Sequence, residues 1–333
     1  MENYLAFTWL LLIGFFVIMY VISDGLDLGT GILFPFVKSQ HDRDLMISSI
    51  LPVWDGNQTW LVLGGASLYG AFPLAFSALL PVLYVPLFFM LLALLFRGIT
   101  FEFRLKAKTS IKRWDRLFFL GSVLAAFVQG IVLGTFVQGF KVQNGILVFG
   151  YLSWFTPFSF ITGLGVVAGY GLLGAGWLIM KTEGQLQQQL YRIAKILLLL
   201  VVIFLVLVSL WTPLVDEKTK MFWFNPDYFI KLAVLPMITG VLLASLWHML
   251  HKQQERFPFW LTTGVFLCAY AGFLINSWPY LIPHEITYWQ AAAPRNTLQF
   301  MLVGVLIMLP ILLYYTFSAY YIFRGKVKEV IKY

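Results

Sequence analysis

The stretch LPVWDGNQTWLVLGG, residues 51–65, decides the fold of this chain. It opens an otherwise apolar segment with four polar side chains, those of Asp55, Asn57, Gln58 and Thr59. If the segment crosses a membrane, these groups stand where a charged side chain costs a few kcal/mol at the centre of the bilayer. The carboxylate at residue 55 therefore raises one question about topology and another about function.

The composition identifies a membrane protein. The chain has 333 residues, of which 60% are hydrophobic and 11% charged, with a mean hydropathy of +0.82. Soluble domains carry roughly 25% charged residues. The single cysteine, Cys268, lies in an apolar stretch. One cysteine excludes a disulfide within the chain and a metal or redox site of the CxxC type.

Nine segments reach the length of about 20 mostly apolar residues that a membrane-crossing helix needs. Hydrocarbon offers no water to backbone groups, so such segments form helices rather than single strands. The predicted fold class is therefore an all-α polytopic membrane protein, one membrane domain over residues 1–333 without a soluble domain. The spans are expected near residues 5–36, 48–74, 77–101, 114–138, 155–181, 190–212, 228–250, 258–279 and 297–323.

The basic residues set the orientation, because cytoplasmic loops collect Lys and Arg. With nine spans, 18 of the 23 basic residues fall on the side that holds the C-terminus. Removing the span at 48–74 would put basic connections on opposite faces. The prediction is therefore an N-terminus outside and a C-terminus in the cytoplasm. The net charge of +8 then indicates attraction to an anionic membrane surface rather than binding of nucleic acid.

Four of the fifteen acidic residues fall within the predicted spans, and the other eleven, Asp44 and Asp115 among them, are assigned to loops or tails. The four are expected at one depth near the cytoplasmic side, on the first three spans. Acids inside a membrane are by default paired or functional. The four are Asp24, Asp27, Asp55 and Glu102.

Two interpretations of these acids stay open. In the first, Asp55 and Glu102 pair with Arg97 or Arg104, and the two aspartates of the first span cap local turns around Gly25 and Gly29. In the second, the acids form a proton uptake route, with Asn57, Gln58, Thr59 and Ser23 holding water between them. The two interpretations do not exclude each other.

Glycines and histidines point to structure rather than to cofactor binding. The glycines of the first span (Gly25, Gly29, Gly31) and of the fifth (163–176) have spacings that let helices approach closely. Histidine is the commonest protein ligand of haem iron, yet none stands in the middle of a span. His248 and His251 are expected at a solvated, cationic helix end. We therefore expect no haem bound by this chain alone. The four histidines are His41, His248, His251 and His284.

Two classes of function fit these features. A proton-coupled secondary transporter acting alone would place ionisable residues near the midplane in both halves of a repeat. Here the acids lie in the first third of the chain and at one depth. A redox-linked or proton-conducting subunit, whose partner carries the cofactors, fits this asymmetry better.

Four motifs resemble subunit II of the cytochrome bd-type quinol oxidases, a family that includes the cyanide-insensitive oxidases. The resemblance covers nearly the whole chain, and these motifs appear in the family's order. They are SDGLDLGTG (23–31), PVWDGNQTWLV (52–62), FRGITFEFR (96–104), and YWQAAAPRNTLQFMLVG (288–304) followed by PILLYYTFSAYYIFRGKV (310–327).

The resemblance implies an architecture and an activity. It implies two four-helix bundles, residues 1–140 and 151–281, and a peripheral ninth helix at 295–325. It implies a partner, subunit I, that carries haems b and d, or b-type haems only, and the quinol site. The complex would oxidise ubiquinol or menaquinol and reduce dioxygen to water without pumping protons, in a bacterial or archaeal cytoplasmic membrane. Small accessory subunits and a bound lipid or quinone are further expected partners.

The resemblance also implies site residues. Trp54 and Asp55 match a family motif that lines a proton channel, Asp24 matches the first aspartate of the first motif, and Glu102 matches an acid that follows an arginine. Arg97 and Arg104 are the expected ion-pair partners. Trp54 is equally open to interpretation as an interfacial anchor. Gln290 departs from the family, whose members often carry an aspartate there, so an acidic role at that position is in doubt.

Overall fold

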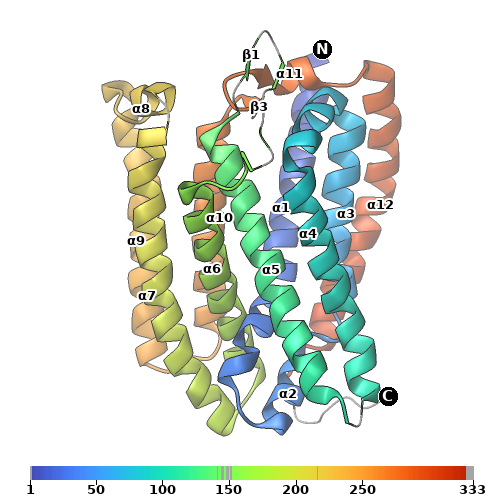
Figure 1. The fold of residues 1–333 in the computed structure, drawn as a ribbon, viewed down its shortest axis with the longest axis vertical. Helices are drawn as coiled ribbons and strands as arrows, with labels where there is room; N and C mark the ends of the chain where they lie inside the picture. The colour runs from blue at the N-terminus through green and yellow to red at the C-terminus, as the bar shows by residue number, and fades with distance from the viewer. Residues whose placement is uncertain are drawn as a thin grey trace.

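The chain is a bundle of long helices standing side by side (Figure 1). The computed structural model describes residues 2–107, 109–140, 142–143, 146–147, 150, 152–215 and 217–327. Four basic residues of the charge count, Lys108, Lys141, Lys328 and Lys332, lie outside these ranges. Eight helices in the described part are long and apolar enough to cross a membrane. The all-α polytopic membrane class predicted from composition is therefore confirmed.

Each of these eight helices overlaps one predicted span. Of these, α4 and α7 extend several residues beyond both predicted limits, and polar or basic side chains continue each of them at one end past the apolar stretch. The helices are α1 (Glu2–Leu33), α4 (Pro73–Lys106), α5 (Ile111–Gln138), α6 (Pro157–Lys181), α7 (Gly184–Val215), α9 (Pro226–His251), α10 (Phe257–Ser277) and α12 (Arg295–Ile322).

The predicted second span at 48–74 is wrong as one continuous helix. The structure has α2 (Gln40–Ile50), a turn, and then α3 (Trp54–Ala71), which has 18 residues and is not among the eight apolar spans. Pro52 lies in the turn and has no N–H to donate to a helix. Val53 N instead donates to Ile50 O at 3.0 Å, which tightens the turn. The break places Asp55 in the first turn of α3.

The two ends of the bundle differ. One end, here called the α11 end, holds the N-terminus, α11 (Tyr288–Ala291) and two small hairpins (Figure 1). The hairpins are β1 (Val142–Gln143) with β2 (Ile146–Leu147), and β3 (Tyr280–Ile282) with β4 (Ile286–Thr287). A short helix, α8 (Glu217–Trp223), caps α7 and α9. The opposite end, here called the α2 end, holds η1 (Phe34–Phe36), α2 and the end of α12.

Glycines bring α1 and α6 together, and the predicted role of these glycines in close helix packing is confirmed. A Cβ added to Gly29 would lie 1.9 Å from Tyr170 O, and one added to Gly174 would lie 2.4 Å from the backbone of Gly29. Gly130 of α5 approaches Gly163 of α6 in the same way: a Cβ added to Gly130 would lie 2.6 Å from the Cα of Gly163. The close approach makes α1 and α6 the centre of the bundle, with α3 and α5 also packed on α1. Helix α1 is continuous from Glu2 to Leu33. The turns expected around Gly25 and Gly29 therefore do not exist.

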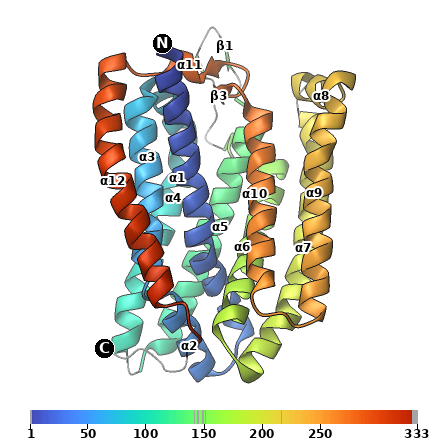
Figure 2. The same cartoon turned by 180° about the vertical axis from the view of Figure 1, so that it is seen from behind.

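The last helix lies on the outside and is tied down at both ends. Figure 2 shows α12 crossing α1 and α3, and Leu298 is its one fully buried residue in the described range. At the α2 end the following tail binds the end of α6: Val327 N donates to Lys181 O at 2.9 Å, and Lys326 Nζ to Thr182 O at 2.9 Å. Lys326 also pairs with Glu255 at 3.0 Å, which joins the α9–α10 connection to this tail.

Candidate functional site: a buried acid cluster

Asp24 and Arg97 form an ion pair inside the bundle. Arg97 Nη2 of α4 donates to Asp24 Oδ1 of α1 at 2.6 Å, and both side chains are 0% exposed. A hydrogen bond between two charged groups in a region without water is short and strong. Arg97 therefore does not pair with Asp55 or Glu102, the partners expected for it from the sequence.

Asp27, one turn further along α1, is also fully buried. Its Oδ2 accepts a hydrogen bond from Asn57 Nδ2 of α3 at 2.9 Å, and the same amide donates to Ser23 O at 3.0 Å. Asn57 Oδ1 in turn accepts a bond from the hydroxyl of Tyr320, on α12, at 2.9 Å. A hydrogen-bonded chain thus leads from α12 through α3 to the acid on α1.

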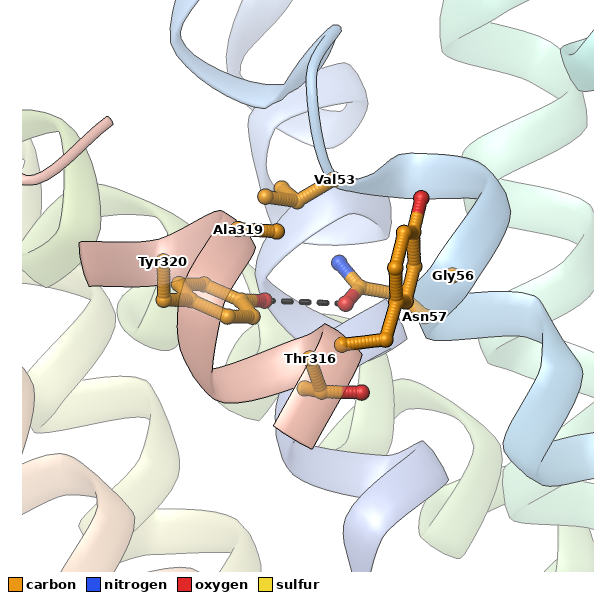
Figure 3. Close-up of a pocket in the computed structure, with 7 residues that line it drawn as sticks. Val53, Gly56, Asn57, Thr316, Ala319 and Tyr320 are labelled. Atoms are coloured by element: carbon orange, nitrogen blue, oxygen red, sulfur yellow. Dashed lines mark hydrogen bonds between the residues drawn. The ribbon is translucent and has the colours of Figure 1, made fainter. Parts of the chain in front are cut away.

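Figure 3 shows the outer end of this chain. Tyr320 points across from α12 to Asn57, and the dashed line joins the two side chains. A small cleft between α3 and α12 lies beside this bond, with a volume of about 10 Å³, which is room for one water molecule. Its lining residues are Val53, Gly56, Asn57, Tyr315, Thr316, Ala319 and Tyr320.

Several polar atoms of the acid cluster have no hydrogen-bond partner among the described residues. They are Asp24 Oδ2, Asp27 Oδ1, and Nε and Nη1 of Arg97. Buried polar groups in proteins are almost always satisfied. At these four atoms the described side chains leave hydrogen-bonding capacity unused.

A second branch of polar groups leads from Asp24 toward the second half of the chain. Tyr20 lies one turn before Asp24 on α1 and interacts with it electrostatically. Its hydroxyl accepts a bond from Gln129 Nε2 of α5 at 2.9 Å, and Gln129 Oε1 accepts one from the Tyr170 hydroxyl of α6 at 2.8 Å. The polar groups therefore cross the whole interface between α1, α5 and α6.

Arg104 belongs to a different cluster, nearer the α2 end. Its Nε donates to Asp115 Oδ1 at 2.6 Å, and its Nη2 lies 2.8 Å from Asp44 Oδ1. Arg43 Nη1 donates to Asp115 Oδ2 at 2.9 Å. The assignment of Asp115 to a loop is therefore wrong: it lies on α5, is 5% exposed and holds two arginines. The cluster is balanced, with two acids and two arginines.

Aromatic side chains separate the two clusters. The ring of Phe101 lies between those of Trp54 and Phe118, at 4.7 and 5.3 Å, and Phe34 lies 4.8 Å from Phe118. Arg104 packs over Phe34 at 5.6 Å. Phe101, in the middle of this layer, stands between Arg97 and Arg104 on α4. Trp54, a predicted site residue, is half-buried and forms part of this layer.

Asp55 and Glu102 lie on the surface of this chain rather than in its interior. Asp55 is exposed in the first turn of α3, two residues before Asn57. Glu102 is 70% exposed, on α4, and Lys106 lies 3.9 Å away. The structure therefore brings Asp24 and Asp27 together and leaves the other two acids outside the cluster. It does not pair either of them with Arg97 or Arg104.

Tyr320, Gln129 and Tyr170 are not among the site residues predicted from the sequence. Tyr320 lies in an aromatic run, FSAYYIF, and the spacing alone does not tell which tyrosine turns inward. Gln129 is the one amide in the apolar stretch 117–136, and a polar group in such a place is the signal that would have found it.

The histidines and Gln290 have structural places. His248 and His251 are exposed at the end of α9, His41 is exposed on α2, and His284 lies in the β3–β4 turn. All four histidines thus lie on α2, in the last turns of α9 or in a turn of the described chain. The Gln290 side chain accepts bonds from Thr287 N at 2.9 Å and Thr287 Oγ1 at 2.7 Å and so caps α11.

Comparisons with known proteins agree on one family. A model of the family "Cytochrome bd terminal oxidase subunit II" matches residues 5–323. Subunit 2 of the cytochrome bd-I ubiquinol oxidase of Escherichia coli K12 is 26% identical, with 98% of this chain and 96% of that protein aligned. Subunit 2 of the cytochrome bd ubiquinol oxidase of Bacillus subtilis is 27% identical, with 96% of each aligned.

A solved structure has the same fold. The bd oxidase of Geobacillus thermodenitrificans matches with a TM-score of 0.79 at 20% identity, covering 96% of this chain and 98% of that one. The family match spans nearly all described helices and includes the motifs that hold Asp24, Asn57 and Arg97. This chain belongs to the cytochrome bd terminal oxidase subunit II family.

Proposed function

We propose that this chain is the haem-free subunit of a quinol-oxidising, dioxygen-reducing complex and that it conducts protons from the cytoplasmic side toward its partner. Family membership makes it a subunit of a bd-type oxidase and disfavours the alternative of a transporter acting alone. The single observation that supports a proton role is the fully buried Asp24–Arg97 pair next to Asp27. A charge so placed is costly, and function is the usual reason for keeping it.

In this proposal the partner, subunit I, would hold haems b and d, or b-type haems only, and these would supply the electron transfer from ubiquinol or menaquinol to dioxygen. The residues of this chain take up protons and conduct them toward the partner. Asp55 and Glu102, exposed on α3 and α4, collect protons and face the partner. Trp54 shields the buried cluster beneath them, in which Asp24 and Arg97 hold charge beside Asp27.

The proposal includes a topology. Nine helices cross the bacterial or archaeal cytoplasmic membrane, with α3 as the ninth, the α11 end outside and the α2 end in the cytoplasm. Residues 1–140 and 151–281 form two four-helix bundles, and 295–325 the peripheral helix. Its support is that Arg43, Arg104, Lys181, Arg256 and Lys326 gather at the α2 end, as expected of a cytoplasmic face. A reporter fused after Tyr333 that is active only in the cytoplasm tests this orientation.

The test of the proton role is Asp55→Leu in the two-subunit complex. Because Asp55 is exposed and bonded to no buried group of this chain, assembly with haem is expected to stay normal. Quinol-driven oxygen uptake is expected to fall at least about tenfold, since a positioned acid or base contributes about 10²-fold or more. Glu285→Gln, an exposed acid at the α11 end, is the matched control. Normal uptake in an assembled Asp55→Leu complex contradicts the role.

Partners beyond subunit I complete the proposal. Small single-helix accessory subunits and a lipid or quinone fit the many exposed apolar side chains of α4, α7 and α12. Purification of the complex in mild detergent, with mass spectrometry of its proteins and lipids, tests for them. A transporter would instead take up substrate when this chain alone is reconstituted in vesicles.

A further inference from the structure

The two clusters of charged residues differ in their balance. In the cluster nearer the α2 end, Asp44 and Asp115 face Arg43 and Arg104, so the charges cancel. In the deeper cluster, Asp24 and Asp27 face Arg97 alone, and all three side chains are 0% exposed. If both acids were ionised, the deeper cluster would carry one uncompensated negative charge.

An uncompensated charge does not persist in such a place. The cost of burying an isolated ion is so large that the group takes up a proton instead. The titratable groups that act on the two acids are Arg97 from α4, Tyr20 from α1, Tyr170 from α6 and Tyr320 from α12. The three tyrosines are neutral phenols at physiological pH. Asn57 of α3 and Gln129 of α5 do not titrate, so none of these groups supplies the missing positive charge.

We infer that the resting protein holds one proton in this cluster, on Oδ1 of Asp27. Asp24 keeps its negative charge because its Oδ1 accepts the 2.6 Å bond from Arg97. Asp27 receives one neutral donor, the Asn57 amide, and that bond goes to Oδ2. Oδ1 of Asp27 is buried and makes no hydrogen bond to a described residue, which leaves it as the oxygen that carries the proton.

The carboxyl group that carries this proton is hydrogen-bonded toward the surface through its other oxygen, Oδ2. Asn57 links Asp27 to the Tyr320 hydroxyl, and the cleft between α3 and α12 lies beside that hydroxyl. On the side of the balanced cluster, the aromatic layer of Phe34, Trp54, Phe101 and Phe118 lies along α4. The use of the proton in oxygen reduction rests on the proposed function above. Its presence rests only on the charges and hydrogen bonds of the cluster.

Infrared spectroscopy of the assembled two-subunit complex tests the inference, because a protonated buried carboxyl has a carbonyl band separate from that of a carboxylate. The wild-type complex is expected to show such a band, which shifts in D₂O. Asp27→Asn is expected to remove it while haem content stays normal, since the amide keeps the size and the neutrality of the acid. Asp24→Asn is expected to remove it as well, because Asp27 then ionises beside Arg97.

A third variant identifies the residue. Asn57→Leu removes the hydrogen bond to the carbonyl oxygen of Asp27, so the band is expected to persist and move to higher wavenumber. Asp44→Asn, in the balanced cluster, is the matched control and is expected to leave the band unchanged. A band that survives Asp27→Asn overturns the inference. A band whose wavenumber does not change in Asn57→Leu overturns the assignment to Asp27. A bound metal cation in place of the proton would show as a spectrum without the Asp27 band.

These outcomes are separate from those of the proposed function. If the infrared variants behave as expected and Asp27→Asn still consumes oxygen at the normal rate, the stored proton stands and its use in turnover is excluded. If Asp55→Leu lowers oxygen uptake while no band depends on Asp27, the proton role of the chain stands and the stored proton is excluded.

Discussion

Arg97 Nη2 lies 2.6 Å from Asp24 Oδ1, and no part of either side chain is exposed. The pair joins α1 and α4. Among the described residues of the cluster, Arg97 is the one positive group, and it faces both Asp24 and Asp27. Buried ion pairs contribute little net stability, yet removal of one partner is costly because the other charge stays behind. The pair therefore fixes the protonation of its surroundings more than it strengthens the fold.

Arg97→Leu is expected to destabilise the protein by about 3–5 kcal/mol, because it leaves Asp24 and Asp27 without their counter-ion. The measurement is the thermal stability and yield of the assembled complex. Arg116→Leu, which removes an exposed arginine of α5, serves as the control and is expected to change neither. Asp24→Asn added to Arg97→Leu is expected to recover part of the loss. Equal stability of Arg97→Leu and wild type would contradict the importance of this pair.

Tyr320→Phe is expected to slow oxygen uptake roughly fivefold, the effect of about 1 kcal/mol for one hydrogen bond. The change removes the bond to Asn57 at 2.9 Å and keeps the ring against Trp177, at 5.7 Å between centroids. Haem content reports assembly, and the solvent isotope effect on turnover reports proton transfer. The neighbouring Tyr321, exposed on the same helix, gives the matched control Tyr321→Phe. Identical rates for the two variants would exclude the α3–α12 cleft as a route to Asp27.

Gly29→Ala is expected to cost about 1–3 kcal/mol through overpacking. The added Cβ would lie 1.9 Å from Tyr170 O, a backbone atom that cannot turn aside, so α1 and α6 must separate. Thermal unfolding of the complex measures the cost. In Gly240→Ala of α9 the new Cβ meets nothing within 4 Å, and no loss is expected there. A stable Gly29→Ala protein would show that the two helices are not held at this distance.

The tail after α12 is expected to respond to pH through Glu255. Hydrogen bonds from Gln187 and then from Lys326 hold the pKa of Glu255 below its usual value. The pKa of Glu255 is therefore lower in the folded protein than in the unfolded one. The stabilisation that ionised Glu255 gives to the tail is complete above the unfolded pKa of about 4.3 and is lost as the pH falls through the folded pKa. Glu255→Gln is expected to have the same effect at neutral pH.

Limited trypsin cleavage at Lys326 measures the release of this tail. Cleavage in Glu255→Gln is expected to be faster than in wild type at neutral pH. The control Glu183→Gln changes an exposed acid beside α6 and is expected to match wild type. Equal cleavage in all three proteins would mean that the backbone bonds of Val327 and the Lys181 side chain hold the tail without Glu255.

The sequence by itself determined the membrane class, the approximate place of each long helix and the family. Apolar length and the distribution of basic residues are local properties, and they survive any arrangement of the helices. The role of these glycines in close packing could also be predicted, because glycines at helical spacing let helices approach each other whatever the partner helix is. The break at Pro52 was missed since a proline near a helix start is often tolerated.

Only the tertiary structure decided which charges meet. Arg97 and Arg104 lie seven residues apart on one helix face, and nothing in that spacing says that the first binds Asp24 and the second Asp44 and Asp115. The partners come from α1, α2 and α5, and their choice follows from how those helices pack. Packing also decides that two acids, Asp24 and Asp27, are buried with a single arginine, Arg97. It removes water from Asp24 and Asp27 while leaving Asp55 and Glu102 at the surface.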